Sequence, residues 1–438
     1  CGFTGYRQDQ KTVIERMMKA IEHRGPDSEG SFCREKITLG FRRLSIIDLE
    51  DGQQPMESAD GNLHIVFNGE IYNYKELRAE LEAFGISFCT HSDTEVLINT
   101  IQQYGEKALD KLRGMFGFAV WNEKEQTLML ARDFFGIKPV YYAEIDGHFV
   151  FASEIKSILA FPGYERKVNQ KALEQYLSFQ YSPLEETFFK GIYKLMPGHM
   201  LLYKNGSYEI KTYFKPKLTP GQWNHKTNMA QLRSQLSEIL KDSVKHHMLS
   251  DVEVGAFLSG GVDSGYLASS SGADQAFTVG FDEGDRYSEV NKAAKVAEKA
   301  GLKHHVKIIS KQEFWDALPD VMYHMDEPLA DASAVALYFL SKEAAGHVKV
   351  VLSGEGADEL FGGYNIYREP ESLKKIAWIP FGVRRVIGKL AAKLPDVKGR
   401  DFLIRAGMKV EERFIGNAYI YREKEKAQIL KNKVTGPS

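Results

Sequence analysis

The sequence predicts two domains of different fold class: an α+β domain rich in antiparallel sheet, then an α/β domain built on a parallel sheet. The length of 438 residues exceeds what one hydrophobic core usually organises. Up to about residue 205, short strand-like runs are separated by tight turns, as in antiparallel hairpins. Beyond about residue 229, apolar runs alternate with helical patterns, which indicates parallel strands joined by crossover helices.

In the N-terminal part, residues 63–67 (LHIVF) have the pattern of a strand that ends at a turn formed by Asn68 and Gly69. A helix follows, and Asn73 and Glu76 predict a capping pair at its start. Further hairpins are predicted within VWNEKEQTLMLA and AEIDGHFVFAS. Together these elements favour the α+β class.

The predicted boundary is a stretch with two prolines, two glycines and little periodicity. We therefore predict a first domain over residues 1–205, a linker over 206–228 and a second domain over 229–438. After a long helix, the second domain shows four apolar runs with the character of parallel strands: VEVGAFL, AFTVGF, HHVKII and VKVVLS.

The overall composition excludes several classes of protein. With 57 basic and 59 acidic residues, the net charge of -2 leaves no electrostatic footprint for nucleic acid. No apolar run reaches the roughly 18 residues that span a bilayer, and no leader precedes Cys1, so we expect no membrane association and a cytoplasmic location. The other cysteines, Cys33 and Cys89, are expected to be buried, inert thiols, because no disulfide or zinc spacing is present.

A glycine-rich loop, SGGVDS, follows the first strand of the second domain and opens a helix. Its glycines, Gly260 and Gly261, let the backbone N–H groups approach an anion, and Ser259 and Ser264 add hydroxyl donors. The carboxylate of Asp263 beside phosphates is expected to act as a Mg²⁺ ligand. The loop lacks the lysine of the GxxxxGK[ST] motif, and an ordinary glycine turn is the alternative.

A second glycine-rich turn, SGEGADELFGGY, follows the strand VKVVL. Ser353 and Gly354 are candidates for nucleotide contacts, because open α/β sheets bind ligands at the carboxyl ends of their strands. The acids Glu355, Asp358 and Glu359 point to a metal, Asp358 being our second candidate Mg²⁺ ligand. A solvated helix start is the alternative for Asp358 or Glu359 taken singly.

Cys1 is the first residue of the sequence, CGFTGYRQDQ. A thiol needs a base to become a nucleophile, and an N-terminal residue carries one in its own α-amino group. The alternative is that Cys1 is only where the given sequence starts.

Four further motifs carry a family resemblance: HRGPDSEG, RRLSIIDLEDGQQPM, FNGEIYNY and HSDTEV. They resemble the glutaminase domain of class II, N-terminal-nucleophile amidotransferases, and SGGVDS resembles the pyrophosphatase-type loop of ATP-cleaving ligases. In this order, and over nearly the whole chain, they resemble the glutamine-dependent asparagine synthetase family.

The resemblance implies roles in a glutaminase site. Cys1 would attack the glutamine amide to form a thioester, and Arg43 would pair with the substrate carboxylate. Asp93 would hold the α-ammonium group, with Glu70 helping to fix that end. Two adjacent residues would form the oxyanion hole, Asn68 through its side chain and Gly69 through its backbone N–H.

The resemblance also implies a second, ATP-dependent site. Leu258 and Val279 would frame the adenine and ribose, Ser353 and Gly354 would contact AMP, and Glu355 would help form a β-aspartyl-AMP. The implied reaction makes asparagine from aspartate with ammonia from glutamine, releasing glutamate, AMP and pyrophosphate. Its substrates would be glutamine, aspartate and ATP with Mg²⁺, and a homodimer is an open expectation.

The sequence departs from the family at its end. Members normally continue through a helical segment with an SLExRVPFLD-like motif, whereas this sequence ends LKNKVTGPS. We expect a natural short form, a truncated form or an incompletely recorded sequence.

Three alternative functions remain: a sibling amidotransferase that amidates another carboxylate, such as one in a cell-wall precursor, a β-lactam-forming synthetase, and a binding protein with inactive sites. The adjacent histidines His246, His247, His304 and His305 are expected to serve surface or packing roles rather than to bind metal, because neighbours on a helix or strand point apart.

Overall fold

The computed structural model describes residues 1–217, 228–282, 289–395, 397–413, 420–421 and 423–430. The chain divides into two compact units. The first comprises residues 1–169, 184–327 and 332–353, and the second comprises residues 170–183, 328–331 and 354–438. Among the described residues, none of the helices is both long and apolar enough to cross a membrane.

The N-terminal part contains two six-stranded sheets. Both sheets are antiparallel. The first has the order β10-β8-β9-β1-β3-β2, with β1 Gly2–Thr4, β2 Ser28–Cys33, β3 Ile37–Arg43, β8 Tyr141–Ile145, β9 His148–Ala152 and β10 Ile192–Lys194. The second has the order β12-β11-β7-β6-β5-β4, with β4 Met56–Glu57, β5 Leu63–Ile71, β6 Gly114–Asn122, β7 Thr127–Arg132, β11 His199–Lys204 and β12 Ser207–Thr212.

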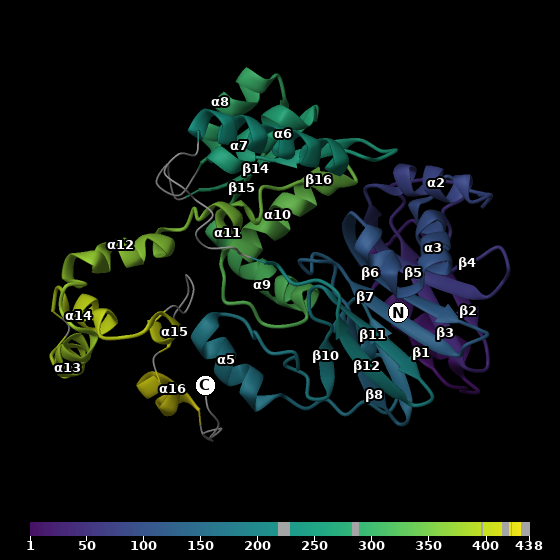
Figure 1. Cartoon of the computed structure of the whole chain (residues 1–438), viewed down its shortest axis with the longest axis horizontal. Helices are drawn as coiled ribbons and strands as arrows, with labels where there is room; N and C mark the ends of the chain where they lie inside the picture. Colours follow the sequence, from purple (N-terminus) through teal and green to yellow (C-terminus); the bar gives the residue numbers. More distant parts are fainter. Residues whose placement is uncertain (218–227, 283–288, 396, 414–419, 422, 431–438) are drawn as a thin grey trace. The chain divides into compact units, whose positions relative to one another are not determined.

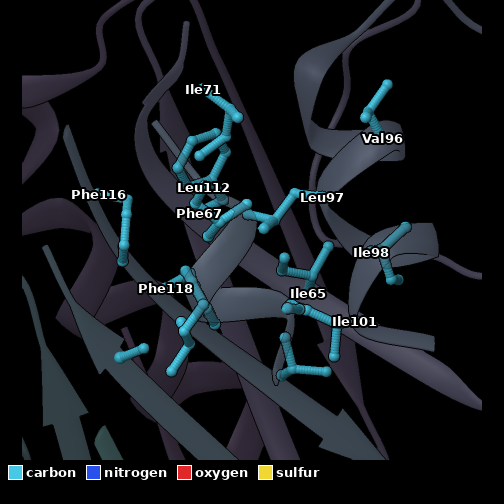
Figure 2. Close-up of a cluster of buried hydrophobic side chains, with 14 of the residues drawn as sticks. Ile65, Phe67, Ile71, Val96, Leu97, Ile98, Ile101, Leu112, Phe116 and Phe118 are labelled. Carbon is cyan, nitrogen blue, oxygen red and sulfur yellow. The ribbon is translucent and has the colours of Figure 1, made fainter. Parts of the chain in front are cut away.

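These two sheets form the inner layers of a four-layer arrangement, because alternate strand residues face either the other sheet or a helical layer. The core between the sheets joins residues of β3, β8 and β9 to residues of β5, β6, β7 and β11. Helices α1 (Gln10–Lys19) and α4 (Ile155–Leu159) pack on the first sheet. Helices α2 (Tyr74–Ala83) and α3 (Asp93–Tyr104) pack on the second, where Figure 2 shows side chains of α3 meeting those of β5 and β6. Two short 3-10 helices, η1 Glu22–Arg24 and η2 Gly105–Lys111, complete this part.

The turn predicted at Asn68 and Gly69 is wrong. Strand β5 continues through both residues, which pair with Gly117 and Phe116 of β6. The predicted capping of α2 by Asn73 is also wrong. Its side chain donates a hydrogen bond to the Lys111 carbonyl and accepts one from the Arg113 N–H, and it makes none to the start of α2. In both cases a long-range pairing replaced the local structure that the sequence favours.

The hairpins β6-β7 and β8-β9 confirm the two predicted in the N-terminal part. The strand β12 pairs with β11 and lies inside the range predicted as a linker. Another part of that range, residues 218–227, lies outside the described residues. A long helix, α6 (Met229–His247), begins after the N-cap residue Asn228.

The predicted parallel sheet is confirmed, with the strand order β15-β14-β13-β16. Its strands are β13 Val254–Phe257, β14 Gln275–Phe281, β15 Lys303–Ile309 and β16 Val350–Leu352. The helices between them are α7 Val262–Ser271, α8 Val290–Ala300, α9 Lys311–Met325 and α10 Ser333–Ala345. Figure 1 shows α6, α7 and α8 on one side of this sheet and α9 and α10 on the other.

The second unit is helical in its described residues. Its α-helices are α5 Gln170–Phe179, α11 Ala357–Phe361, α12 Glu369–Leu373, α13 Phe381–Ala391, α14 Arg400–Ala406, α15 Val410–Arg413 and α16 Glu423–Ile429. Its 3-10 helices are η3 Asn365–Arg368 and η4 Lys374–Ile376. Within this unit, Lys426 of α16 donates a hydrogen bond to the Ser178 hydroxyl of α5.

The burial expected for two cysteines is not found. Cys89 is exposed and Cys33 is only partly buried. Both thiols are free.

Candidate functional site

A cavity of about 230 Å³ opens in the N-terminal part of the chain. Residues from β1, β3, β5 and α3, or directly beside them, reach it. The six residues predicted for a glutaminase site all line it: Cys1, Arg43, Asn68, Gly69, Glu70 and Asp93. The fold therefore brings together side chains that are distant in the sequence.

The amino group and the thiol of Cys1 lie beside the same carbonyl. The α-amino nitrogen donates a hydrogen bond to the Gly40 oxygen at 2.9 Å, and Sγ lies 3.6 Å from that oxygen. Burial lowers the pKa of the α-amino group from 8.0 to about 5. The amine is therefore largely neutral at pH 7 and can accept a proton.

Arg43 ends β3 and is buried, and its guanidinium is held by backbone carbonyls of the following loop. Nη1 donates to the Leu49 oxygen at 3.2 Å, and Nη2 donates to the oxygens of Ile47, at 3.2 Å, and Asp48. These contacts use three of the five N–H donors of a guanidinium. The group is fixed in place and keeps donor capacity for an anion in the cavity.

Asn68 and Gly69 lie side by side on β5, at the cavity wall. The Asn68 Nδ2 is buried and has no hydrogen-bond partner among the described residues. A buried amide without a partner is costly, and such groups often serve a ligand. At Gly69, a Cβ would lie 2.0 Å from the Met115 oxygen, so only glycine fits this close approach of β5 and β6.

Glu70 and Asp93 are two buried carboxyl groups that line the cavity. Burial raises the pKa of Glu70 to about 7, with Asp93 raising it further and Lys138 opposing. Burial also raises the pKa of Asp93 to about 6, against a hydrogen bond of 3.0 Å from the Ile71 N–H. A cationic ligand beside this pair would favour its ionised form.

Two cavity residues were missed by the sequence analysis. Lys138 lines the cavity, and burial lowers its pKa. Gln54 bridges β5 and α3, since its Nε2 donates to the Phe67 oxygen and the Thr94 hydroxyl, each at 3.2 Å. The sequence signal for Lys138 is a lysine inside the otherwise apolar run FFGIKPV.

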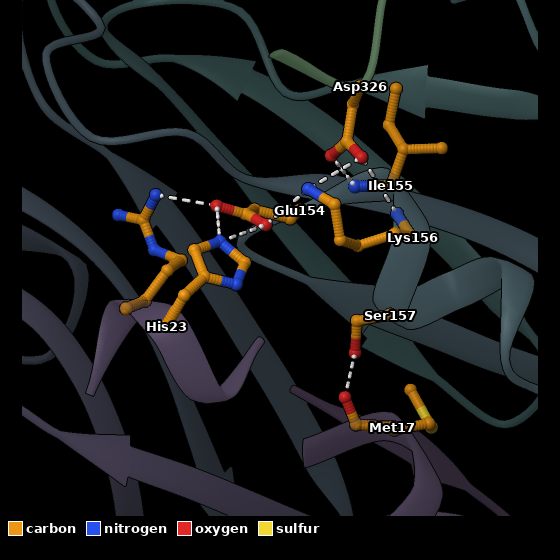
Figure 3. A network of polar contacts seen from close by, with 8 residues as sticks. Met17, His23, Glu154, Ile155, Lys156, Ser157 and Asp326 are labelled. Carbon is orange, nitrogen blue, oxygen red and sulfur yellow. Dashed lines mark hydrogen bonds and ion pairs between the residues drawn. The ribbon is translucent and has the colours of Figure 1, made fainter. Parts of the chain in front are cut away.

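A buried ion-pair network joins the segment after β9 to the end of α9 (Figure 3). Lys156 Nζ lies 2.6 Å from a Glu154 carboxylate oxygen and 2.8 Å from one of Asp326. Burial opposes ionisation of Glu154, but hydrogen bonds from His23 and Lys156, together with the charge of Arg24, lower its pKa to about 2. Asp326 also accepts hydrogen bonds from the first N–H groups of α4. The network ties the N-terminal part to the helix that follows β15.

The SGGVDS loop joins β13 to α7 and is held by its two serines. Their hydroxyl oxygens lie 2.9 Å apart, and the Ser259 N–H donates to the Ser264 hydroxyl at 3.2 Å. Gly260 has a φ of +77°, and a Cβ there would lie 2.7 Å from the Lys292 Cβ of α8. Asp263 lies exposed in the first turn of α7, and among the described residues its carboxylate has no hydrogen-bond or ion-pair partner.

Three predicted nucleotide contacts lie at the carboxyl edge of the parallel sheet. Leu258 follows β13 and is buried, Val279 lies near the end of β14, and Ser353 follows β16. The parallel pairing of β13 with both β14 and β16 puts these residues at the same edge, beside the loop.

The remaining predicted residues, Gly354, Glu355 and Asp358, belong to the second unit. Glu355 is exposed, and Asp358 lies in the first turn of α11. This short helix begins after Gly356, whose φ is +89°.

Known families match both parts of the chain. Residues 1–214 match a family model described as a glutamine amidotransferase domain, and residues 235–431 match one described as asparagine synthase.

Three relatives illustrate the likeness. The chain is 45% identical to glutamine-hydrolysing asparagine synthetase 1 of Bacillus subtilis strain 168, over 99% of this chain and 70% of that protein. It is 32% identical to glutamine-hydrolysing asparagine synthetase 3 of the same strain, over 86% of this chain and 66% of that one. It is also 32% identical to amidase chry2 of Gibberella zeae, over 82% of this chain and 57% of that protein.

Proposed function

The chain belongs to the glutamine-hydrolysing asparagine synthetase family, and on that premise we propose that it makes asparagine from aspartate, with nitrogen released from glutamine. The single observation that carries the glutamine half is the Nδ2 of Asn68, which has no partner among the described residues and lies in a cavity it shares with the Cys1 thiol. A donor left unsatisfied in the resting protein is well suited to an oxyanion that exists only during the reaction.

In the proposed first step, the neutral α-amine of Cys1 takes the thiol proton and Sγ attacks the amide carbon of glutamine. The C–N bond then breaks, the proton passes from the α-ammonium to the leaving nitrogen, and ammonia departs. Water hydrolyses the resulting thioester to glutamate and restores the thiol. The lowered pKa of the amine supports this role, because it keeps the base unprotonated at neutral pH.

Substrate orientation is assigned to three charged side chains of the cavity. Arg43 would bind the α-carboxylate with its remaining N–H donors, since its loop contacts fix the guanidinium. Asp93 and Glu70 would hold the α-ammonium group. Their raised pKa values support this, because ionising a buried carboxyl pair is unfavourable and the attraction of a bound cation would offset that free energy.

The second half of the reaction is assigned to the parallel sheet. The loop at 259–264 would bind the pyrophosphate part of ATP through its backbone N–H groups and hydroxyls, while Leu258 and Val279 frame the nucleoside and Ser353 and Gly354 contact AMP. Aspartate would displace pyrophosphate to form β-aspartyl-AMP, with Glu355 assisting, and ammonia would then displace AMP.

Mg²⁺ fits the donor set of this loop, because the exposed Asp263 carboxylate, which has no hydrogen-bond or ion-pair partner among the described residues, offers the hard oxygen ligands that the ion prefers. Asp263 would hold the ion, which when bound neutralises phosphate charge. Lacking a lysine for the γ-phosphate, the loop favours release of AMP rather than ADP.

A second candidate function is the amidation of another carboxylate by the same two sites. The relatives include one that is not named as an asparagine synthetase, amidase chry2, at 32% identity over 82% of this chain, so likeness at this level does not fix the acceptor. The two candidates differ only in the acceptor that reaches the activated phosphate.

The deciding experiment is mass spectrometry of products from ATP, amide-labelled ¹⁵N-glutamine and a panel of carboxylates, with the full-length protein. We expect labelled asparagine, AMP and pyrophosphate when aspartate is the acceptor. Labelled product only from another carboxylate would select the second candidate. ADP as the nucleotide product would refute the proposed ATP chemistry.

A further inference from the structure

Two histidines and a glutamate from different elements of the parallel-sheet region come together outside the sites described above. His305 lies on β15, Glu343 lies in the last turns of α10, and His347 follows that helix. One potential ligand atom from each residue lies within 4.8 Å of the others. The rings of His305 and His347 have centroids 4.0 Å apart at an interplanar angle of 41°.

The ring of His305 is oriented by a chain of hydrogen bonds. Glu253 accepts a hydrogen bond from the Gln275 Nε2 at 2.7 Å, which turns the Gln275 Oε1 toward His305. This oxygen lies 2.8 Å from the His305 Nε2 and can only accept, so Nε2 carries the proton. The Nδ1 lone pair of His305 therefore remains for a ligand. A second polar group that fixes the tautomer is the usual companion of a metal-binding histidine.

The other two residues are spaced for one helical face. Glu343 and His347 are four residues apart, and the helical turn continues past α10 because the His347 N–H donates to the Ala344 oxygen at 2.9 Å. The His347 Nε2 lies 3.8 Å from a Glu343 carboxylate oxygen. Both side chains are partly exposed, so an ion can reach them from solvent.

We propose that His305, Glu343 and His347 bind a divalent transition-metal ion of the zinc class. Two imidazoles and one carboxylate are a common ligand set for zinc, with a fourth position for water. Ligand bonds of about 2.0–2.2 Å require the ligand atoms to approach to about 3.5 Å, which small rotations of the two exposed side chains supply.

The site lies at the edge of the sheet opposite the SGGVDS loop. His305 is near the start of β15, and His347 precedes β16, whereas the loop follows the end of β13. A bound ion would cross-link β15 to the end of α10 and stabilise the sheet without touching nucleotide. The competing explanation is an aromatic cluster, since His305 also stacks on Phe277 with centroids 5.0 Å apart.

The test is a Zn²⁺ titration of the full chain by calorimetry in saturating Mg²⁺, which occupies hard oxygen sites. The background carries Cys1→Ala, Cys33→Ala and Cys89→Ala, because free thiols also bind zinc. We expect one equivalent of tight binding and a rise in melting temperature. Co²⁺ in place of Zn²⁺ should give the visible absorption bands of a low-coordinate site.

Four variants make the result specific. His347→Ala and Glu343→Gln, at partly exposed positions that should not disturb folding, are expected to weaken Zn²⁺ binding at least tenfold. Gln275→Ala keeps all three ligands and should weaken binding by about 10- to 100-fold. The matched control is His246→Ala. It disrupts a pair with the same spacing, His246 and Asp242, in which the carboxylate contacts Arg113 instead of a second imidazole. Unchanged affinity in His347→Ala and Glu343→Gln, or equal loss in His246→Ala, would overturn the proposal in favour of an aromatic cluster.

Discussion

The α-amino nitrogen of Cys1 lies 2.9 Å from the carbonyl oxygen of Gly40, and the thiol of the same residue lies 3.6 Å from that oxygen. The backbone N–H of Gly40 in turn donates to the Cys1 carbonyl at 2.8 Å, as β1 pairs with β3. This pairing holds the proposed base and the proposed nucleophile, both on Cys1, beside the same Gly40 carbonyl. The proton can move between them without a histidine.

The pH dependence of glutamine hydrolysis should separate catalysis from binding. We expect kcat to fall to half near pH 5, since the α-amine is active when unprotonated and its pKa is about 5 rather than 8.0. As the pH is lowered, KM should begin to rise earlier than kcat falls. The rise should start below about pH 7, as Glu70 and then Asp93 take up protons. Glu70→Gln should remove the KM effect near pH 7 and leave the kcat limb near pH 5. A kcat limb near pH 8 would contradict the proposed base.

Replacing Arg43 by lysine should raise the KM for glutamine while kcat changes little. A lysine keeps the charge but loses the paired hydrogen bonds, which we estimate at about 1.5–3 kcal/mol, or about 10- to 150-fold in KM. Steady-state kinetics would measure this. The matched control is Arg42→Lys on the same strand, because Arg42 pairs with Glu22 and Glu29. Equal effects of the two substitutions would mean that Arg43 has only a structural role.

Asn68→Ala should lower kcat by about 10²- to 10³-fold without lowering the melting temperature. The stability is expected to hold because the Asn68 Nδ2 has no partner among the described residues. Asn73→Ala is the opposite control: it removes two hydrogen bonds, to Lys111 and from Arg113, and should cost stability but not kcat. Thermal melts and kinetics of both variants would show the crossed pattern. A destabilised Asn68→Ala with normal kcat would exclude the oxyanion role.

Gly260→Ala should raise the KM for ATP at least tenfold and leave glutamine hydrolysis unchanged. Its φ of +77° is unfavourable for alanine, and the new Cβ would also press on Lys292 and the Ala293 nitrogen of α8. Gly272→Ala is the matched control, because its φ of +74° carries the same backbone cost with open space around it. If both variants bind ATP equally, the close approach of the loop to α8 is unimportant for the nucleotide.

The architecture was predictable because periodicity is a local property of the sequence. The two hairpins and the four parallel strands follow from alternation and apolar runs, and all are present. Such reasoning could not have avoided the wrong prediction of a turn at Asn68 and Gly69. These residues are turn formers locally, but pairing with β6 keeps them in a strand.

The candidate sites also contain features that the sequence predicted and features that it could not. Motifs identified the residues of the glutamine cavity. The protonation state of the Cys1 amine, and the Asn68 Nδ2 to which no described residue is hydrogen-bonded, depend on burial, which only the fold supplies. The neighbouring histidines His304 and His305 do point apart, as predicted, since His304 contacts Thr278. The sequence could not show that His305 would meet His347 from another element.

The sharpest prediction concerns the independence of the two reactions in the full-length protein. Cys1→Ala removes the thiol from the N-terminal cavity and leaves the SGGVDS loop intact, so synthesis from glutamine should stop. Free ammonia at high concentration and raised pH should still give product, because it replaces only what Cys1 would release. Asp263→Asn should end synthesis with either nitrogen source and leave glutamine hydrolysis largely unchanged. The substitution keeps the shape of an exposed side chain that has no partner among the described residues, so the fold should be retained.

Measuring both variants with both nitrogen sources gives four outcomes that a single shared active site could not produce. Pyrophosphate release would follow the second reaction, and glutamate release would follow the first. Loss of ammonia-dependent synthesis in a Cys1→Ala protein that is folded and still binds ATP would show that the thiol takes part in both reactions. The division of chemistry between the cavity at Cys1 and the loop at Asp263 would then be wrong.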